Sequence, residues 1–120
     1  MANKNQTTNG DLRTPVVFFS AQIDEGLDGR DTSFEEVFMT FAEVYNPSSK
    51  DIQIADSVNA KANFTIKIRD PLTAYVPNNK HFVEIKDNRY SSQKWQIVDV
   101  RPSFDERYFL TIVLGGIVDD

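Results

Sequence analysis

A strictly alternating stretch in the middle of the chain constrains the fold most. Within residues 62–69, apolar side chains at Ala62, Phe64, Ile66 and Ile68 alternate with polar ones. A sustained period of two is typical of a half-buried β-strand, whereas a helix would scatter these side chains around its circumference. We therefore predict a central strand whose core-facing residues are Phe64, Ile66 and Ile68, ending before the following proline, which has no amide hydrogen to continue a ladder.

The flanking segments predict a mainly β domain around that strand. Segment 34–45 has apolar residues at both helix and strand spacings, and its Val, Phe and Tyr content favours a strand. Residues 49–59 combine serines suited to an N-cap with apolar residues at helical spacing, which indicates a short helix. About six strands in so short a chain hide their edges best in a small antiparallel β-barrel or sandwich with long loops. The other expected strands are 15–23, 82–86, 94–100 and 108–114.

The chain divides into a polar N-terminal arm at 1–13, expected to be mobile, a single barrel domain at 14–116, and a short acidic tail at 117–120. The formal net charge is −5, and no basic run is present. Such a chain is a poor candidate for tight nucleic-acid or anionic-membrane binding. Since it has neither a signal peptide nor a long apolar span, we expect synthesis in a cytoplasm and no membrane partner.

No pattern in the sequence predicts catalysis, a cofactor or a metal site. His81 is the single histidine and is expected to be an exposed loop residue. Cysteines are absent, and the acids within 24–31 do not follow the order of a calcium loop. Trp95 alternates with Ile97, which favours a core position over base stacking. The sequence therefore predicts a binding or assembly protein with no catalytic and no metal-binding residues, not an enzyme.

Three short motifs carry a resemblance to a known family. They are Phe41-Ala42-Glu43-Val44, Ile66-Lys67-Ile68-Arg69 and Trp95-Gln96-Ile97, followed by a last strand at 110–114. Their order resembles that of the head–tail joining proteins of long-tailed bacteriophages, also called head-closure or stopper proteins. The resemblance implies a structural virion protein of the neck, made in the host bacterial cytoplasm, whose copies form a six- or twelve-fold ring.

In such a ring the channel closes after DNA packaging and the tail docks, with portal, adaptor and tail terminator as partners. DNA would pass through without sequence-specific binding. A tail terminator, another neck or tail component, and a small-barrel module that binds a peptide or glycan remain alternatives. The resemblance implies that a long loop reaches neighbouring subunits or the channel. By position, the first candidate is Asp24, Glu25, Gly26, Leu27, Asp28, Gly29, Arg30 and Asp31, within an exposed loop expected at 24–33, and the second is Tyr75, Val76, Pro77, Asn78, Asn79 and Lys80.

Overall fold

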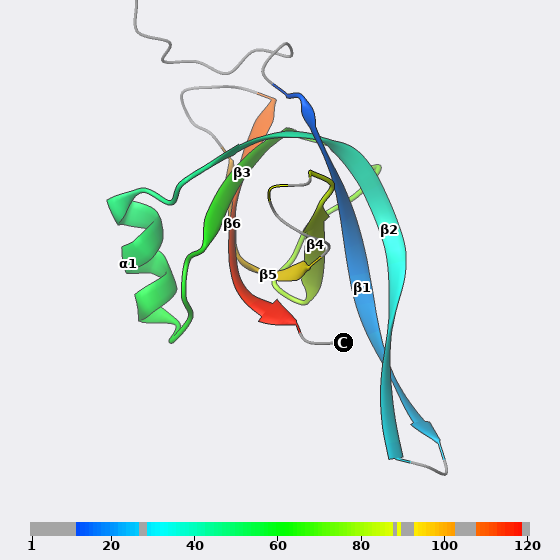
Figure 1. Cartoon of the computed structure of the whole chain (residues 1–120). Coiled ribbons are helices and arrows are strands. Elements are labelled where there is room, and N and C mark those ends of the chain that lie inside the picture. The colour runs from blue at the N-terminus through cyan, green and yellow to red at the C-terminus, as the bar shows by residue number, and fades with distance from the viewer. Residues whose placement is uncertain (1–11, 27–28, 88, 90–92, 103–107, 119–120) are drawn as a thin grey trace, which may run out of the picture.

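Six antiparallel strands close into a barrel in the computed structural model, which describes residues 12–26, 29–87, 89, 93–102 and 108–118. The order around the barrel is β1-β2-β3-β6-β5-β4 (Figure 1). The mainly β fold with one short helix is therefore as predicted. The bounds are β1 Thr14–Gly26, β2 Gly29–Tyr45, α1 Ser49–Ser57, β3 Phe64–Arg69, β4 His81–Ile85, β5 Lys94–Pro102 and β6 Phe109–Val118.

The barrel interior is filled by the side chains that alternate inward from each strand. Ile66 and Ile68 of β3 are completely buried there, and Phe64 is partly buried with its ring edge-on to Trp95, 5.0 Å between centroids. Phe18 of β1 is also fully buried. The alternation in the central stretch thus places its apolar residues toward the core. The remaining fully buried interior positions are Val16, Ala42, Val83, Ile85, Ile97, Ile112 and Leu114.

The prediction of an exposed loop at 24–33 is wrong, because most of that segment is β-strand. β1 continues to Gly26, β2 begins at Gly29, and the two pair residue by residue from the barrel out to Gly26 opposite Gly29. Glycines and acids are turn signals in sequence, but here the two glycines flank a short connection, and the acids lie in a ladder that supplies their backbone hydrogen bonds. Leu27 and Asp28 lie outside the described residues.

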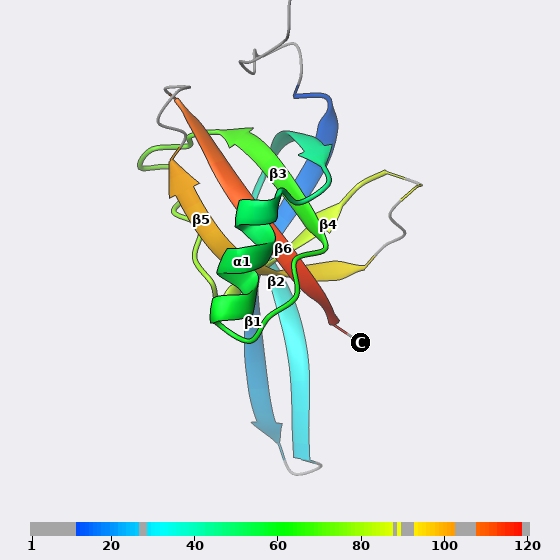
Figure 2. The same cartoon turned by 90° about the vertical axis from the view of Figure 1, so that its left-hand side faces the viewer.

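Helix α1 covers one outer side of the barrel, over β3, β5 and β6 (Figure 2). Ser48 caps it: its Oγ accepts from the Asp51 amide at 3.1 Å, and Asp51 accepts from the Ser48 amide at 3.0 Å, a reciprocal capping box. Thr65 was expected on the solvent face of the central strand but is fully buried. The helix explains this, since Asp51 accepts a 2.7 Å hydrogen bond from the Thr65 hydroxyl.

Candidate assembly surface

The β1–β2 hairpin extends beyond the barrel. β1 pairs with β4 only over residues 16–20, and β2 pairs with β3 only over residues 42–45. Past those limits the two strands pair only with each other among the described residues, from Ala21 opposite Phe34 to the tip. Figures 1 and 2 both show the ribbon leaving the barrel body on the side away from the start of β1. The first predicted candidate segment is therefore the end of a paired two-stranded arm.

This arm carries most of the net charge of the chain. Residues 21–34 hold four acids and one arginine, a net −3, and Glu35 and Glu36 at the base of the arm bring residues 24–36 to −5, which equals the net charge of the whole chain. In the ladder, Asp24 lies opposite Asp31 while Glu25 lies opposite Arg30. Like charges directly opposite each other destabilise a strand pair. The arm is thus an acidic element whose charge pattern favours a basic partner.

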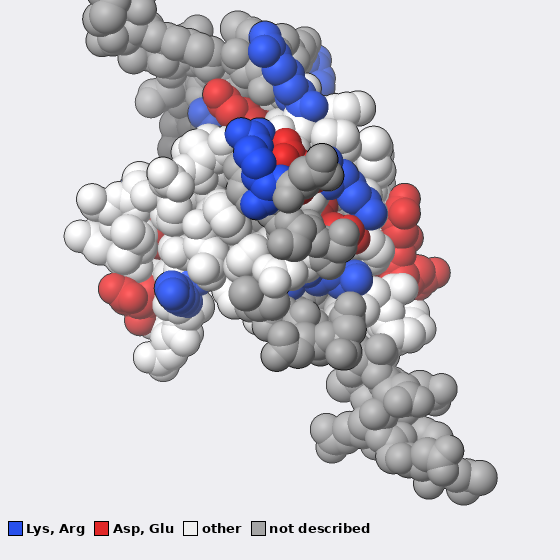
Figure 3. Space-filling view, viewed as in Figure 1, with Lys and Arg blue, Asp and Glu red and all other residues white. Residues whose placement is uncertain are grey.

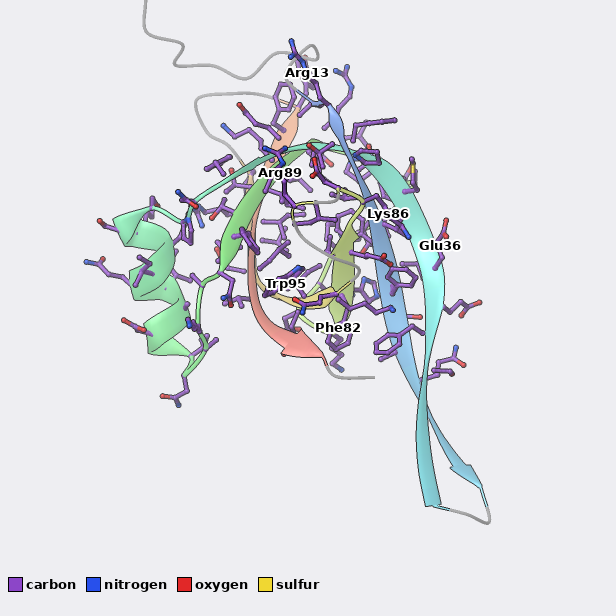
Figure 4. The ribbon with its side chains drawn as sticks, in the orientation of Figure 1. Arg13, Glu36, Phe82, Lys86, Arg89 and Trp95 are labelled. Atoms are coloured by element: carbon purple, nitrogen blue, oxygen red, sulfur yellow. The ribbon has the colours of Figure 1, made fainter. Side chains whose placement is uncertain are left out.

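An aromatic cluster with one cation joins the arm to the barrel. The Phe34 ring on β2 meets Phe19 of β1 edge-on at 6.5 Å and Phe82 of β4 edge-on at 5.5 Å between centroids. The ammonium of Lys94 on β5 lies 5.1 Å from the Phe19 ring centre and 4.9 Å from that of Phe34, which is cation–π distance. Residues from four strands therefore fix the direction in which the arm leaves the barrel. Figure 4 labels one of them, Phe82 of β4.

The outer side of β2 carries an apolar stripe, composed of Val37, Met39 and Phe41, which are 39%, 44% and 45% exposed. Met39 lies opposite Val17, which is buried although it points outward. The pairing shifts between Phe18 opposite Phe38 and the next pair, so that Val37 is an extra residue at a bulge. Three neighbouring exposed apolar side chains on one strand are typical of a contact surface.

Glu84 lies beside this stripe and is almost completely buried, on the outer side of β4. It is opposite Val17 on β1 and Lys94 on β5, and it accepts a 3.1 Å ionic hydrogen bond from Lys86. Figure 3 shows lysine and arginine gathered over the upper part of this view and acids at the edge formed by β2. The outer side of β1, β2 and β4 therefore combines apolar residues with a border of both charges, in which Lys86 is paired with Glu84.

The second predicted candidate segment is anchored in the core at its first residue. Tyr75 is only 8% exposed, and its ring stacks on Phe38 at 4.9 Å and packs against Phe18 at 5.0 Å. Pro77 is buried too, whereas Val76 is 69% exposed. Asn78 accepts from the Lys80 amide at 2.8 Å, which closes the turn, and Asn79 and Lys80 are exposed. Only part of this loop is thus available to a partner.

His81 is not the exposed loop histidine that the sequence suggested. It is the first residue of β4, is half-buried, and its Nδ1 is 2.6 Å from the Tyr75 hydroxyl, with the two rings stacked. Burial lowers the pKa of His81 and raises that of Tyr75. The pair fastens the 70–80 loop over one end of the barrel, a role that only the folded loop reveals.

A buried polar network fastens α1 and was not predicted. Asp51 forms an ion pair with Arg101 of β5, and Arg101 also donates to Asp99 at 3.0 Å. Burial alone would raise the pKa of Asp51, but hydrogen bonds from Arg101, Ser48 and Thr65 outweigh it and hold that pKa below its usual value. The network fastens α1 to the barrel wall, because Asp51 of the helix bonds both Thr65 of β3 and Arg101 of β5.

Neither the surface cleft nor the titratable side chains of the described residues indicate a catalytic or metal-binding site. A cleft of about 460 Å³ lies between the end of α1 and the outer side of β5 and β6, lined by residues that include Lys61, Gln96 and Gly115. Across the described ranges, no group of histidines and acids is placed to hold a metal, and no helix is long and apolar enough to cross a membrane.

The comparisons with known proteins support the fold. No protein-family model matches the sequence, and no curated protein matches it. The solution structure of protein SF1141 from Shigella flexneri 2a, a structural genomics target, is similar, with a TM-score of 0.64 and 18% sequence identity. The alignment covers 91% of this chain and 96% of that one. At this identity the likeness shows a shared fold over almost the whole of both chains.

Proposed function

We propose that this chain is a structural virion protein of the head–tail connector of a long-tailed bacteriophage. Its copies form a ring that closes the DNA channel after packaging and docks the tail. The observation that carries the proposal is the acidic arm, which projects beyond the barrel and holds a net −3 of the chain's net charge of −5. An element of this kind suits contact with another subunit, because it adds nothing to the barrel core.

The motifs of the resemblance lend support through their pairing. Ala42, Glu43 and Val44 lie directly opposite Ile68, Lys67 and Ile66, so the first two motifs form one piece of β2–β3 ladder. The third motif places Trp95 in the barrel core. The first two motifs thus share one ladder, and the third lies on β5 with its tryptophan in the same barrel core.

Channel closure in this proposal is steric. The arm is acidic, so it repels DNA phosphates and is unsuited to hold DNA by charge. Arms that meet near a ring axis would block the channel by bulk and leave DNA free to pass when they move apart. The proposal therefore requires no sequence-specific DNA contact, no cofactor and no catalytic residue.

The test is complementation of a phage that lacks this gene with a variant whose arm is shortened. Gln22 and Ser33 lie opposite each other, so residues 23–32 can be replaced by a two-residue Asn-Gly hairpin turn without changing the register. We expect a folded barrel but filled heads that lack tails or lose DNA, counted by electron microscopy. Gln53→Ala on the exposed side of α1 is the control and should restore normal particles. Normal titres from the shortened variant would refute the role of the arm.

A tail terminator would give a different result in the same experiment. Loss of a terminator leaves heads intact and gives tails of abnormal length. Loss of a head-closure ring gives tails of normal length that are not attached to heads. A peptide- or glycan-binding module would leave both particle halves normal. The counted particle classes therefore separate the proposed function from its alternatives.

A further inference from the structure

The single histidine of the chain has a partner at each ring nitrogen. The Nδ1 atom of His81 lies 2.6 Å from the Tyr75 hydroxyl, and its Nε2 atom lies 3.4 Å from the side-chain nitrogen of Asn78. In a neutral imidazole, one ring nitrogen donates a hydrogen bond and the other accepts one. The partners of His81 therefore determine which nitrogen carries the proton.

Asn78 has a defined orientation, because its carboxamide oxygen accepts a 2.8 Å hydrogen bond from the Lys80 amide. The amino group of Asn78 therefore faces His81, and an amide nitrogen of this kind only donates. The accepting nitrogen of His81 is then Nε2, so the proton lies on Nδ1 and points at the Tyr75 oxygen. One orientation of Asn78 thus serves both the turn at 78–80 and the neutral histidine.

A charged His81 is incompatible with this arrangement. An imidazolium donates at both nitrogens, so its Nε2–H would face the amino group of Asn78, which is also a donor. Rotation of the carboxamide would turn its oxygen toward Nε2–H, but the hydrogen bond from the Lys80 amide that closes the turn would then be lost. Burial also lowers the pKa of His81, because water around the charged ring is partly excluded.

The charged and titratable groups around His81 leave this conflict in place. Lys80, its neighbour in the chain, is an exposed cation that opposes a positive ring. On β1 the residue opposite His81 is Ser20, which is neutral, and opposite Ser20 on β2 is the exposed Glu35. Tyr75 stays uncharged, since burial raises its pKa. The protonation state of His81 therefore depends mainly on burial and on its two hydrogen-bond partners.

The rearrangement is confined to the turn. Tyr75 is 8% exposed and stacks on Phe38 at 4.9 Å, so this part of the 70–80 loop is held in the core. On β5, the neutral Gln96 donates to the Asn79 carbonyl at 3.4 Å, an exposed and long hydrogen bond that holds the turn weakly. Residues 78–80 can therefore change conformation while the barrel and the anchored tyrosine stay in place.

We propose that His81 and Asn78 form a pH switch that opens the turn at 78–80 when the histidine becomes charged. With a neutral ring, the Asn78 oxygen holds the Lys80 amide. With a charged ring, that oxygen binds Nε2–H, and the turn changes shape on the exposed part of the second candidate segment. The switch uses only contacts within one chain, so it does not depend on the proposed function.

NMR titration of the labelled full chain tests the switch, because the ring signals of one histidine need no separation from others. Ring nitrogen shifts at neutral pH should show the proton on Nδ1. The pKa of His81 should lie below its ordinary value of about 6.5. The exchange protection of the Lys80 amide, corrected for the intrinsic effect of pH, should fall several-fold at the same midpoint, while that of Ile66 in β3 stays unchanged.

Two asparagine variants separate the switch from a general charge effect. Asn78→Asp supplies a carboxylate that can accept from both the Lys80 amide and Nε2–H, so it should raise the pKa of His81 and keep the Lys80 amide protected throughout. Asn79→Asp is the matched control: it adds the same charge one residue away, at an exposed position, and should raise that pKa much less.

Three results would overturn the inference. One is a proton on Nε2 at neutral pH, and another is protection of the Lys80 amide that does not change as His81 titrates. The third is an equal rise of the His81 pKa in both asparagine variants. Circular dichroism across the same pH range identifies global unfolding, and unfolding of the barrel before the ring titrates would also contradict a switch confined to the turn.

Discussion

Replacement of Asp51 by alanine should remove about a third of the stability of a typical small domain. The change removes the capping box with Ser48, worth about 1 kcal/mol. It also leaves the buried Thr65 hydroxyl without its acceptor, which costs about 1–3 kcal/mol. Arg101 is partly exposed and keeps its ion pair with Asp99, so loss of its ion pair with Asp51 adds less than about 1 kcal/mol. The sum is about 3 kcal/mol, against roughly 5–15 kcal/mol for the folding of a domain.

Urea unfolding followed by circular dichroism measures this loss. We expect a lower midpoint with an unchanged denaturant slope, because the surface exposed on unfolding stays nearly the same. Asp99→Ala is the matched control: it removes the other carboxylate of Arg101, which is more exposed, and should cost no more than about 1 kcal/mol. Because the folded pKa of Asp51 is lowered, its contribution is present above about pH 4 and is lost as the pH falls further. Equal midpoints for the two variants would refute the assignment of the network.

Tyr75→Phe should cost about 1 kcal/mol through the lost hydrogen bond to His81, and Tyr75→Ala about 3–5 kcal/mol through the lost core packing, both measured by urea unfolding. Since burial lowers the folded pKa of His81, stability should fall as the pH drops below about 6.5, and His81→Gln should flatten that slope; a slope unchanged in the variant would contradict this. Gly115→Ala should lower the melting temperature more than Gly116→Ala, because an added methyl at 115 overlaps the Lys61 carbonyl while 116 faces open space at a φ of 70°. The reverse order of the two glycine variants would show that β6 and the 58–63 segment pack differently.

The barrel could be predicted from local patterns because its walls alternate. Ile66 and Ile68 face the core and Thr65 faces outward, as a period of two requires. Alternation does not show whether the outward-facing side chains of a strand are exposed to solvent or covered by another element. Thr65 is buried because helix α1, formed by an earlier segment of the chain, packs on it. This burial is a tertiary contact that the local sequence pattern does not encode. His81 is hidden for a similar reason, since its partner Tyr75 belongs to a loop whose path only the fold defines.

The arm was missed for a different physical reason. Beyond the barrel, the ribbon has no side turned toward the core, so its sequence shows no alternation and reads as a loop of glycines and acids. Its strand character comes from the register between Asp24 and Asp31, which no local pattern encodes. The stripe on β2 was hidden as well, because the segment 34–45 is apolar on both faces, and only the closed barrel shows that Met39 and Phe41 point outward.

The most direct test of the connector function is to remove the protein and count the particles. A phage that lacks the gene should accumulate DNA-filled or emptied heads beside free, normal tails, and supplying the full chain in trans should restore joined virions. Antibody against the chain should then label the neck of the restored particles. Tailed, DNA-filled particles in the complete absence of the protein would contradict the account.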